Sequence, residues 1–407
     1  MKKAYILIFI FFGLIAQAQV FKKSETHNDL KLSSLPYYSY GKGLGMTSAD
    51  SIFQLNIRFR MQNRITYMEK EGEEGAYDAQ IRRLRLRFDG YVGNPHFLYV
   101  IQLSFAPGDV GEIEEGKNIN IIRDAALIYR PNDNWSFTFG QTKLPGNRQR
   151  VNSSGALQLT DRSINNAKFN LDRDFGIQAY YLQEHKDAFS YNIKTAISSG
   201  QGRNWTGNNT NVALTGKLEL LPFGTFSKDG SYFEGDLIRE QDPKLMLSGT
   251  YHQNNNANLS QGQLGEQLFE ARRFNALLLD GILKYNGWAA MLSYMNRMTD
   301  DPITNGVDSN GAAASNYVFA GHGMDYQLSY LFPNNYELIG RYSMQKVQDE
   351  LFDRNVPNTN QYSIGVTKYL WEHAFKIQTE LTFDELRYQS GNQKNNWYLR
   401  VQFEIGI

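Results

Sequence analysis

The sequence has no cysteine, no excess of either charge and only ten prolines. Its 407 residues include 42 Lys and Arg against 42 Asp and Glu, so the formal net charge is zero. Without cysteine there can be no disulfide framework, thiolate metal site or cysteine nucleophile. The balanced charge argues against a nucleic-acid-binding protein, because such domains usually carry a basic excess.

Long apolar runs are also absent beyond the N-terminus. Residues 1–18 combine a basic start, a short apolar stretch and a small-x-small cleavage pattern that ends at Ala18. That stretch, about 12 residues long, cannot cross a hydrocarbon core of roughly 30 Å. We therefore predict a signal peptide over 1–18, an N-terminal extension over 19–50 and one exported domain over 51–407.

A repeated alternation of apolar and polar residues fills that domain. Aromatic residues make up 14% of the chain, yet its mean hydropathy is −0.50. Alternation with period two is typical of strands that have one apolar and one polar face. In 53–67, for example, Phe59 and Ile65 share one face while Arg58 and Arg60 share the other. The sixteen predicted strands are 53–67, 81–92, 97–105, 121–130, 135–143, 175–182, 188–197, 212–221, 243–252, 274–285, 288–298, 317–331, 336–346, 360–369, 374–385 and 397–407.

The connections between these strands alternate in length. Every second connection is mostly a tight turn, with 222–242 as a long exception, and the others run to roughly 11 to 31 residues. Outer-membrane barrels have short turns at one end and long loops at the other, whereas a soluble β-sandwich has no reason to separate them. We predict an all-β, transmembrane antiparallel β-barrel of about 16 strands in the bacterial outer membrane, with lipid against its apolar face. Three strands have mixed faces: 121–130, 274–285 and 317–331.

The charged face of such a barrel must point into the lumen, because a charge facing hydrocarbon costs about 2–4 kcal/mol at the midplane. Sixteen strands leave a lumen too wide for side chains to fill, so we expect an aqueous channel. Arginines along a pore favour anions, and the planar guanidinium suits phosphate. Six arginines lie on the inward face of the first two strands: Arg58, Arg60, Arg64, Arg83, Arg85 and Arg87.

The longest connection, Leu144 to Asp174, is the predicted constriction loop, because a loop of this length is usually functional. We assign two of its arginines, Arg148 and Arg150, to the anion path. Four further cations are assigned to the constriction: Lys143, Arg162, Lys168 and Arg173. Alternatively, the loop stays outside and its charges are ordinary solvated surface. The first two external connections, 68–80 and 106–120, are acidic, and such a mouth would repel an incoming dianion. These connections either bridge divalent cations to surface lipid or, as we prefer, are simple solvated loops.

Four stretches of the chain resemble the phosphate-selective porin O and P family: IRFRMQNRI, IRRLRLRFDGYV, FGQTKLPGNRQRVNSSGALQLTDRSINN and RDFGIQAYY. The resemblance extends over 45–407. It implies a homotrimeric outer-membrane porin of sixteen strands, a third external loop folded into the pore, and arginines that take phosphate or polyphosphate. The six inward arginines and Arg148 and Arg150 match this pattern in type. The lysine-rich vestibule of the family is not evident, since the first two outer loops are acidic.

We therefore predict a porin for passive diffusion of small anions, with phosphate or polyphosphate as candidate cargo. The six histidines show no metal-ligand spacing, so we expect no metal, no cofactor, no catalytic residue and no nucleic-acid partner. Three alternatives remain. They are a general non-selective porin, a non-conducting structural or adhesion barrel, and an outer-membrane hydrolase with a nucleophile and base at the rim.

Overall fold

The computed structural model describes residues 43–110, 120–208, 211–308 and 310–407. The predicted signal peptide, 1–18, and the predicted extension up to residue 42 lie outside these residues. Among the residues described, no helix is long and apolar enough to cross a membrane.

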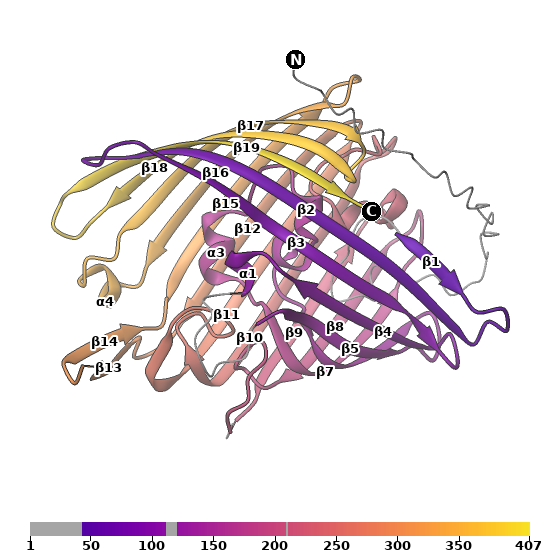
Figure 1. Cartoon of the computed structure of the whole chain (residues 1–407), viewed down its shortest axis with the longest axis horizontal. Helices are drawn as coiled ribbons and strands as arrows, with labels where there is room; N and C mark the ends of the chain where they lie inside the picture. The colour runs from indigo at the N-terminus through magenta and orange to yellow at the C-terminus, as the bar shows by residue number, and fades with distance from the viewer. Residues whose placement is uncertain (1–42, 111–119, 209–210, 309) are drawn as a thin grey trace, which may run out of the picture.

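Sixteen antiparallel strands form a closed barrel, which Figure 1 shows from the side. All sixteen predicted strands are confirmed, although several extend further than the alternation indicated. The barrel strands are β2 (Phe53–Lys70), β3 (Ala76–Val92), β4 (Phe97–Ser104), β5 (Ile122–Tyr129), β6 (Trp135–Lys143), β7 (Arg173–Gln183), β8 (Ser190–Ser198), β9 (Ala213–Leu221), β10 (Lys244–Leu259), β11 (Gln267–Tyr285), β12 (Trp288–Met298), β15 (Gly321–Leu331), β16 (Tyr336–Val347), β17 (Asn358–Trp371), β18 (Phe375–Arg387) and β19 (Gln393–Gly406).

The barrel closes where its last strand meets its first. β19 pairs with β2 from Gly406 opposite Arg60 to Asn396 opposite Lys70. A short strand that the sequence did not predict, β1 (Leu44–Thr47), pairs with β2 just beyond the end of β19. A second unpredicted feature is the hairpin of β13 (Ile303–Val307) and β14 (Ala313–Tyr317), which lies in the connection between β12 and β15.

Helices are confined to the connections. They are α1 (Pro107–Val110), α2 (Arg148–Val151), η2 (Ser154–Ala156), α3 (Ile164–Phe169), η3 (Ser227–Tyr232) and α4 (Asp349–Phe352). Three of these, α2, η2 and α3, belong to the connection between β6 and β7, which lies inside the barrel in Figure 1. The connections therefore fill the lumen as well as cover the mouth.

The outer wall carries the apolar face of each strand. Leu127 and Ile193, for example, are 63% and 44% exposed, as expected of side chains that meet lipid. Aromatic rings pack together near the short turns, with ring centroids 4.7 Å apart for Trp288 and Tyr330. Aromatic rings at this level are typical of the girdle at a membrane interface.

The three strands with mixed faces have a structural explanation. The inward side chains of β5 and β11 include Ile128 and Leu278, which are buried in apolar clusters inside the lumen. These clusters form because connections fold inward and pack on the wall. The third predicted strand, 317–331, was too long at its start, because β15 begins at Gly321 and Tyr317 is the last residue of β14.

Candidate functional site

The connection between β6 and β7, residues 144–172, lies inside the barrel, and we call it the inward loop. Its residues 144–160 are all buried except Arg150, so the predicted inward fold is confirmed and the alternative of an external loop is wrong. Two serines of the loop cap its short helices. Ser153 caps η2 by accepting a hydrogen bond from Gly155 N, and Ser163 caps α3 by accepting one from Asn166 N. These caps stop the short helices from extending and turn the chain around the lumen.

Acidic side chains of one wall hold the inward loop in place. Asp280 of β11 accepts a hydrogen bond from Arg148 N at 2.9 Å, and Glu380 of β18 accepts one from Thr160 N at 2.9 Å. Asp325 of β15 accepts from Ser163 Oγ at 2.7 Å. These three carboxylates of the wall are thus occupied by the inward loop.

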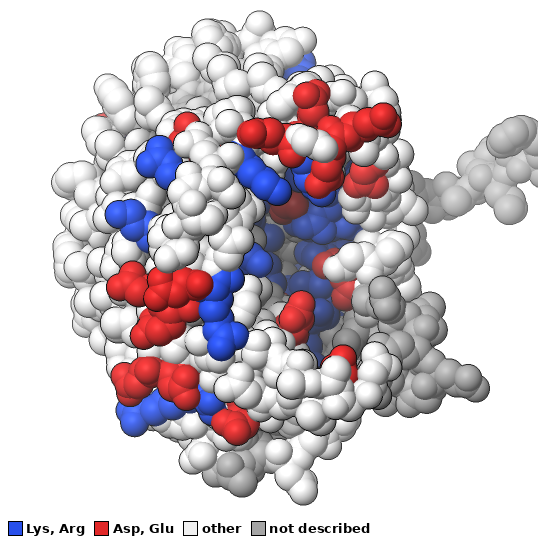
Figure 2. Space-filling view, turned by 90° about the vertical axis from the view of Figure 1, so that its left-hand side faces the viewer, with Lys and Arg blue, Asp and Glu red and all other residues white. Residues whose placement is uncertain are grey.

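On the opposite side, basic side chains enclose a polar cavity of about 210 Å³, which we call the basic cavity. Its cations come from the strands of the wall, from the inward loop and from the connection after β8. They are Arg82, Arg83, Arg85, Arg123, Lys143, Arg150, Arg162, Arg173 and Arg203. Figure 2 shows the long-loop end of the barrel, where blue side chains line the hollow and red ones stand mostly around its rim.

Among the residues that the structure describes, four carboxylates pair with these nine cations. Asp109 lies 2.7 Å from Arg85 and 2.9 Å from Arg123. Asp172 lies 2.6 Å from Arg150. The other two are Asp124, which binds Arg173, and Asp161. The described residues of the group therefore include five more cations than carboxylates.

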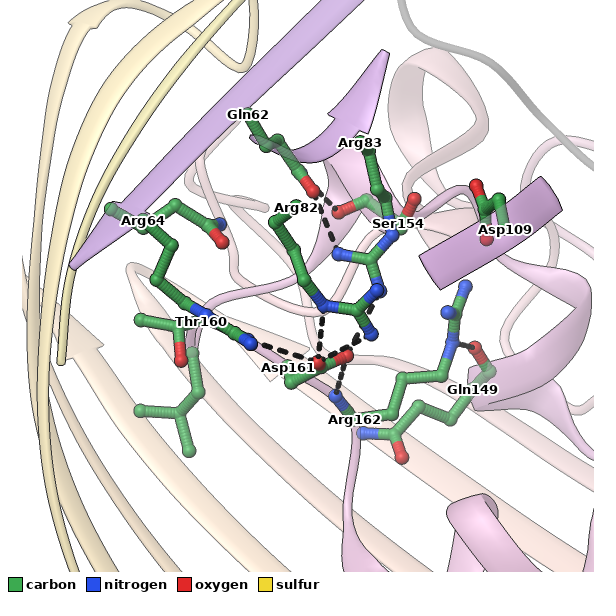
Figure 3. Close-up of polar contacts among 12 residues, drawn as sticks. Gln62, Arg64, Arg82, Arg83, Asp109, Gln149, Ser154, Thr160, Asp161 and Arg162 are labelled. Carbon is green, nitrogen blue, oxygen red and sulfur yellow. Dashed lines mark hydrogen bonds and ion pairs between the residues drawn. The ribbon is translucent and has the colours of Figure 1, made fainter. Parts of the chain in front are cut away.

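Asp161 of the inward loop is the meeting point of three arginines. Its carboxylate lies 2.7 Å from Arg82, 2.9 Å from Arg83 and 3.3 Å from Arg64, and Figure 3 shows the three side chains converging on it. Burial raises the pKa of Asp161, but the fields of Arg83, Arg82 and Arg64 outweigh burial and hold that pKa well below its usual value. The carboxylate therefore stays ionised.

At Arg162, the next residue of the loop, burial and the neighbouring charges together disfavour the charged form. Burial, together with the neighbouring charges of Arg150 and Arg83, lowers the pKa of Arg162 well below the ordinary value for arginine. Its guanidinium donates to two backbone carbonyls, Gln149 O at 2.6 Å and Asn152 O at 2.9 Å. A bound anion would relieve this repulsion between like charges.

Two of the cavity's arginines were missed because β-bulges change the parity of their strands. At the step from Gln62 to Asn63 on β2, Arg82 is the extra residue of β3, and both it and Arg83 reach Asp161. On β5 the extra residue is Arg123, and it reaches Asp109. A bulge re-aims one side chain in this way. The Arg-Arg doublet was the available signal, since strict alternation would place one arginine in lipid.

The structure also changes the role of Asp109. The sequence placed it in an acidic external loop, but α1 carries it inward, where it accepts a hydrogen bond from Ser104 Oγ at 2.7 Å besides its two arginines. The other acids of that loop lie outside the described residues. In the first external loop, residues 71–75 are exposed, as expected if this connection is a solvated loop.

Six predicted site residues line the basic cavity, and six lie elsewhere. The six that line it are Lys143, Arg83, Arg85, Arg150, Arg162 and Arg173. Nearer the short-turn end, Arg58 and Arg87 both bind Asp89, at 2.7 and 2.9 Å. Arg60 donates to Ser153 and Ser154 of the inward loop.

The remaining three also have structural partners. Arg64 pairs with Asp161, as described above. Arg148, assigned to the anion path from sequence, instead donates to the carbonyl oxygens of Ser231 and Phe233 from another connection. Lys168 lies over the ring of Phe319, 5.1 Å from its centroid, and outside the cavity lining. Parity placed Arg64 in the lumen, and the length of the loop predicted that Arg148 and Lys168 would enter it. Neither signal could show which side chains hold the loops together.

The described residues contain no group of three or more His, Asp or Glu side chains that could hold a metal ion. A closed barrel of sixteen strands, with an inward loop and a charged lumen, defines the class of protein: an outer-membrane porin, which is a non-enzymatic channel. Residues 53–233 match the family model described as phosphate-selective porin O and P, so the resemblance noted from sequence is confirmed over those residues.

Solved structures with the same fold are porins and channels of the outer membrane. The channel DcaP of Acinetobacter baumannii has a TM-score of 0.55 and 16% identity, over 89% of this chain and 99% of that one. An anion-selective porin from Comamonas acidovorans has a TM-score of 0.51 and 10% identity, over 87% and 100%. OmpF of Salmonella typhi has a TM-score of 0.54 and 10% identity, over 88% and 100%. No curated protein matches the sequence.

Proposed function

We propose that this porin conducts small anions by passive diffusion and that the basic cavity is its selectivity site. The observation that carries the proposal is the surplus of five cations over carboxylates among the described residues around one cavity. Fixed Arg and Lys charges along a pore attract anions and exclude cations, and the effect grows where water is scarce. Because the short turns of an outer-membrane barrel lie in the periplasm, its long-loop end, and with it the cavity, faces the external medium.

The chemistry of the cavity suits phosphate and polyphosphate. Eight of its nine cations are arginines, whose planar forks bind two oxygens at once. A volume of about 210 Å³ accommodates a small oxyanion with some of its water. The family description supports the same cargo.

The test is the reversal potential of the purified porin in a planar bilayer under a KCl gradient, followed by titration with inorganic phosphate. We expect a potential of the sign that chloride permeation gives, and a fall in chloride current as phosphate binds. A cation-selective potential would contradict the proposal. Anion selectivity without any phosphate effect would leave a general porin, and no conductance at all would favour a structural or adhesion barrel.

Substitution of the two bulge residues tests the site itself. The double variant Arg82→Gln, Arg123→Gln should lower the chloride-to-potassium permeability ratio at least about twofold, because it removes two lining charges. The control is Arg272→Gln, which removes an arginine that pairs with Glu270 and Asp301, away from the cavity lining. Equal ratios in all three proteins would mean that ions do not pass the cavity.

We also propose that the porin is a homotrimer, as the family resemblance implies. The supporting feature is a broad apolar outer wall over β3–β7, where the small residues Ala125 and Gly140 lie among large side chains such as Phe137 and Phe139. Such a surface can pack against a second copy as well as against lipid. Light scattering of the detergent-solubilised protein should give three times the chain mass after correction for detergent, and a monomeric mass would contradict the proposal.

A further inference from the structure

The connection between β9 and β10, residues 222–243, is long where its neighbours at the short-turn end are tight, and we call it the 222–243 insert. Its middle part, residues 230–236, is buried without interruption, whereas residues 227–229 and 241–242 on either side are exposed. The insert therefore enters the barrel from the end opposite to the long loops.

Inside the barrel the insert is bonded to the inward loop. Glu234 accepts hydrogen bonds from Gln149 Nε2 and Gln158 N, both at 2.9 Å. Arg148 of the loop donates from Nε to Ser231 O at 2.9 Å. From the wall, Lys284 donates to the carbonyls of the insert at 2.6–2.7 Å. The two inward segments thus meet in the middle of the lumen and form one body.

The same contact creates a mainly apolar layer next to the basic cavity, at whose edge Tyr232 Oη accepts a hydrogen bond from Lys194 Nζ at 3.2 Å. Tyr232 of the insert and Val151 of the inward loop pack in one cluster with side chains of β3, β4 and β5, and each member is at most 7% exposed. The wall members are Tyr91, Leu98, Val100, Ala126 and Ile128. Val151 borders the cavity directly, because Arg150 lines the cavity and Lys143 Nζ, also of the lining, donates to Val151 O at 3.0 Å.

The layer lies on the periplasmic side of the cavity. Leu98 is the second residue of β4, directly after the short turn that follows β3, whereas Arg123 lies at the other end of β5. Moving a charged group into a dry apolar region is far more costly than moving a neutral one. Apolar constrictions can therefore stop ion flow by excluding water.

We propose that Tyr232 and Val151 form the pore-limiting closure of this porin, and that the 222–243 insert is a plug which must shift before an anion can leave the basic cavity toward the periplasm. This goes beyond the proposed anion selectivity, since it concerns when and how widely the pore opens. The sign of the selectivity depends on the arginines, and the conductance depends on the plug.

The first test is single-channel conductance of Tyr232→Ala. Removal of the ring opens the apolar layer, so the conductance should rise at least about twofold while the reversal potential keeps its sign. The matched control is Phe226→Ala in the same insert, since Phe226 packs in a separate cluster with Leu221, Met246 and Ile282. This control should leave the conductance unchanged. Heat-modifiable migration in gels confirms that each variant is folded.

The outcomes separate this proposal from the proposed function. Unchanged conductance in Tyr232→Ala, with an anionic reversal potential, would overturn the plug and leave the anion porin. A raised conductance with a cationic potential would support the plug and overturn anion selectivity.

The absence of cysteine allows a second test that does not depend on truncating the plug. Single substitutions Arg150→Cys and Val151→Cys place one thiol on the cavity lining and one in the apolar layer. A small charged thiol reagent should modify position 150 readily and position 151 at least about tenfold more slowly, because the reagent cannot enter a dry layer. Adding Tyr232→Ala should remove most of this difference. Equal rates in the two single variants would overturn the proposal.

Discussion

At the scale of single residues, a β-bulge decides whether an arginine side chain faces the lumen or the lipid. Arg82 and Arg123 stand at positions that strict alternation assigns to lipid, and in each case one extra residue turns the side chain inward. Their neighbours, Arg83 and Asp124, also face inward and are fully buried or nearly so. The cavity thus gains charge from positions that the period-two pattern could not supply.

Asp161 is the residue whose removal should change selectivity most directly. In Asp161→Asn the carboxylate that neutralises Arg64, Arg82 and Arg83 is lost, so the chloride-to-potassium permeability ratio should rise, as measured by reversal potential. Three crowded arginines would remain, so we expect a loss of about 3 kcal/mol in stability, seen as a lower temperature of heat modification.

The pH dependence of this stabilisation has a definite sign. Because the folded-state pKa of Asp161 is lowered, its contribution is fully present above the ordinary carboxylate pKa and is lost as the pH falls through the folded-state value. In Asp161→Asn the free energy of unfolding should therefore depend less on acid pH than in the parent protein.

The selectivity prediction for Asp161→Asn has its own contradiction. A chloride-to-potassium permeability ratio equal to that of the parent would mean that Arg64, Arg82 and Arg83 do not face the ion path.

At the scale of elements, the lumen is divided between two tasks. The acidic wall of β11–β18 holds the inward loop through Asp280, Asp325 and Glu380. The basic wall of β3–β7 lines the cavity. This division gathers basic charge on one side of the lumen, so a permeating ion meets a stronger field there than the net charge of zero suggests.

Glu380→Gln should loosen the inward loop. Glu380 accepts bonds from the backbone N–H and the hydroxyl of Thr160, and the neutral amide would weaken both. We expect hydrogen exchange at residues 158–162 to report a fall of about 1–3 kcal/mol in the free energy of opening, together with noisier single-channel currents.

The control is Glu385→Gln on the same strand, β18. Its carboxylate lies 3.5 Å from the exposed Arg387 and touches no part of the inward loop. It should leave exchange in the loop unchanged. If Glu380→Gln behaves like this control, the acidic wall does not hold the loop.

At the scale of the whole molecule, a net charge of zero conceals separate zones. The lumen wall is charged, the belt that meets lipid is apolar, and acidic groups stand at the external rim, as Figure 2 shows. The zones are separated by the barrel wall, so their fields do not simply cancel at the cavity.

The salt dependence of selectivity tests this electrostatic account. The Debye length falls from about 10 Å at 0.1 M to about 3 Å at 1 M ionic strength, so the fixed charges are increasingly screened. At a constant ratio of KCl across the bilayer, the chloride-to-potassium permeability ratio should fall severalfold as the mean concentration rises over this range. A ratio independent of concentration would indicate selection by size instead of charge.

The amino-acid sequence by itself determined the barrel. Alternation along each strand reflects a local requirement, that one side of every strand meets lipid and the other meets water, so strand number, topology and membrane location followed from the pattern. It also predicted twelve cations of the lumen and its constriction loop, six of which, among them Arg85 and Arg150, line the basic cavity.

The tertiary structure alone decided which lumen residues remain available to an ion. Arg148 reaches the lumen on the inward loop and Glu380 faces it from β18, yet both bond to segments that lie far away in the sequence. Tyr232 belongs to a connection that sequence length marked only as unusual, and it closes an apolar layer with Val151, 81 residues earlier. Such contacts depend on the path of loops through three-dimensional space, and period-two alternation carries no information about that path.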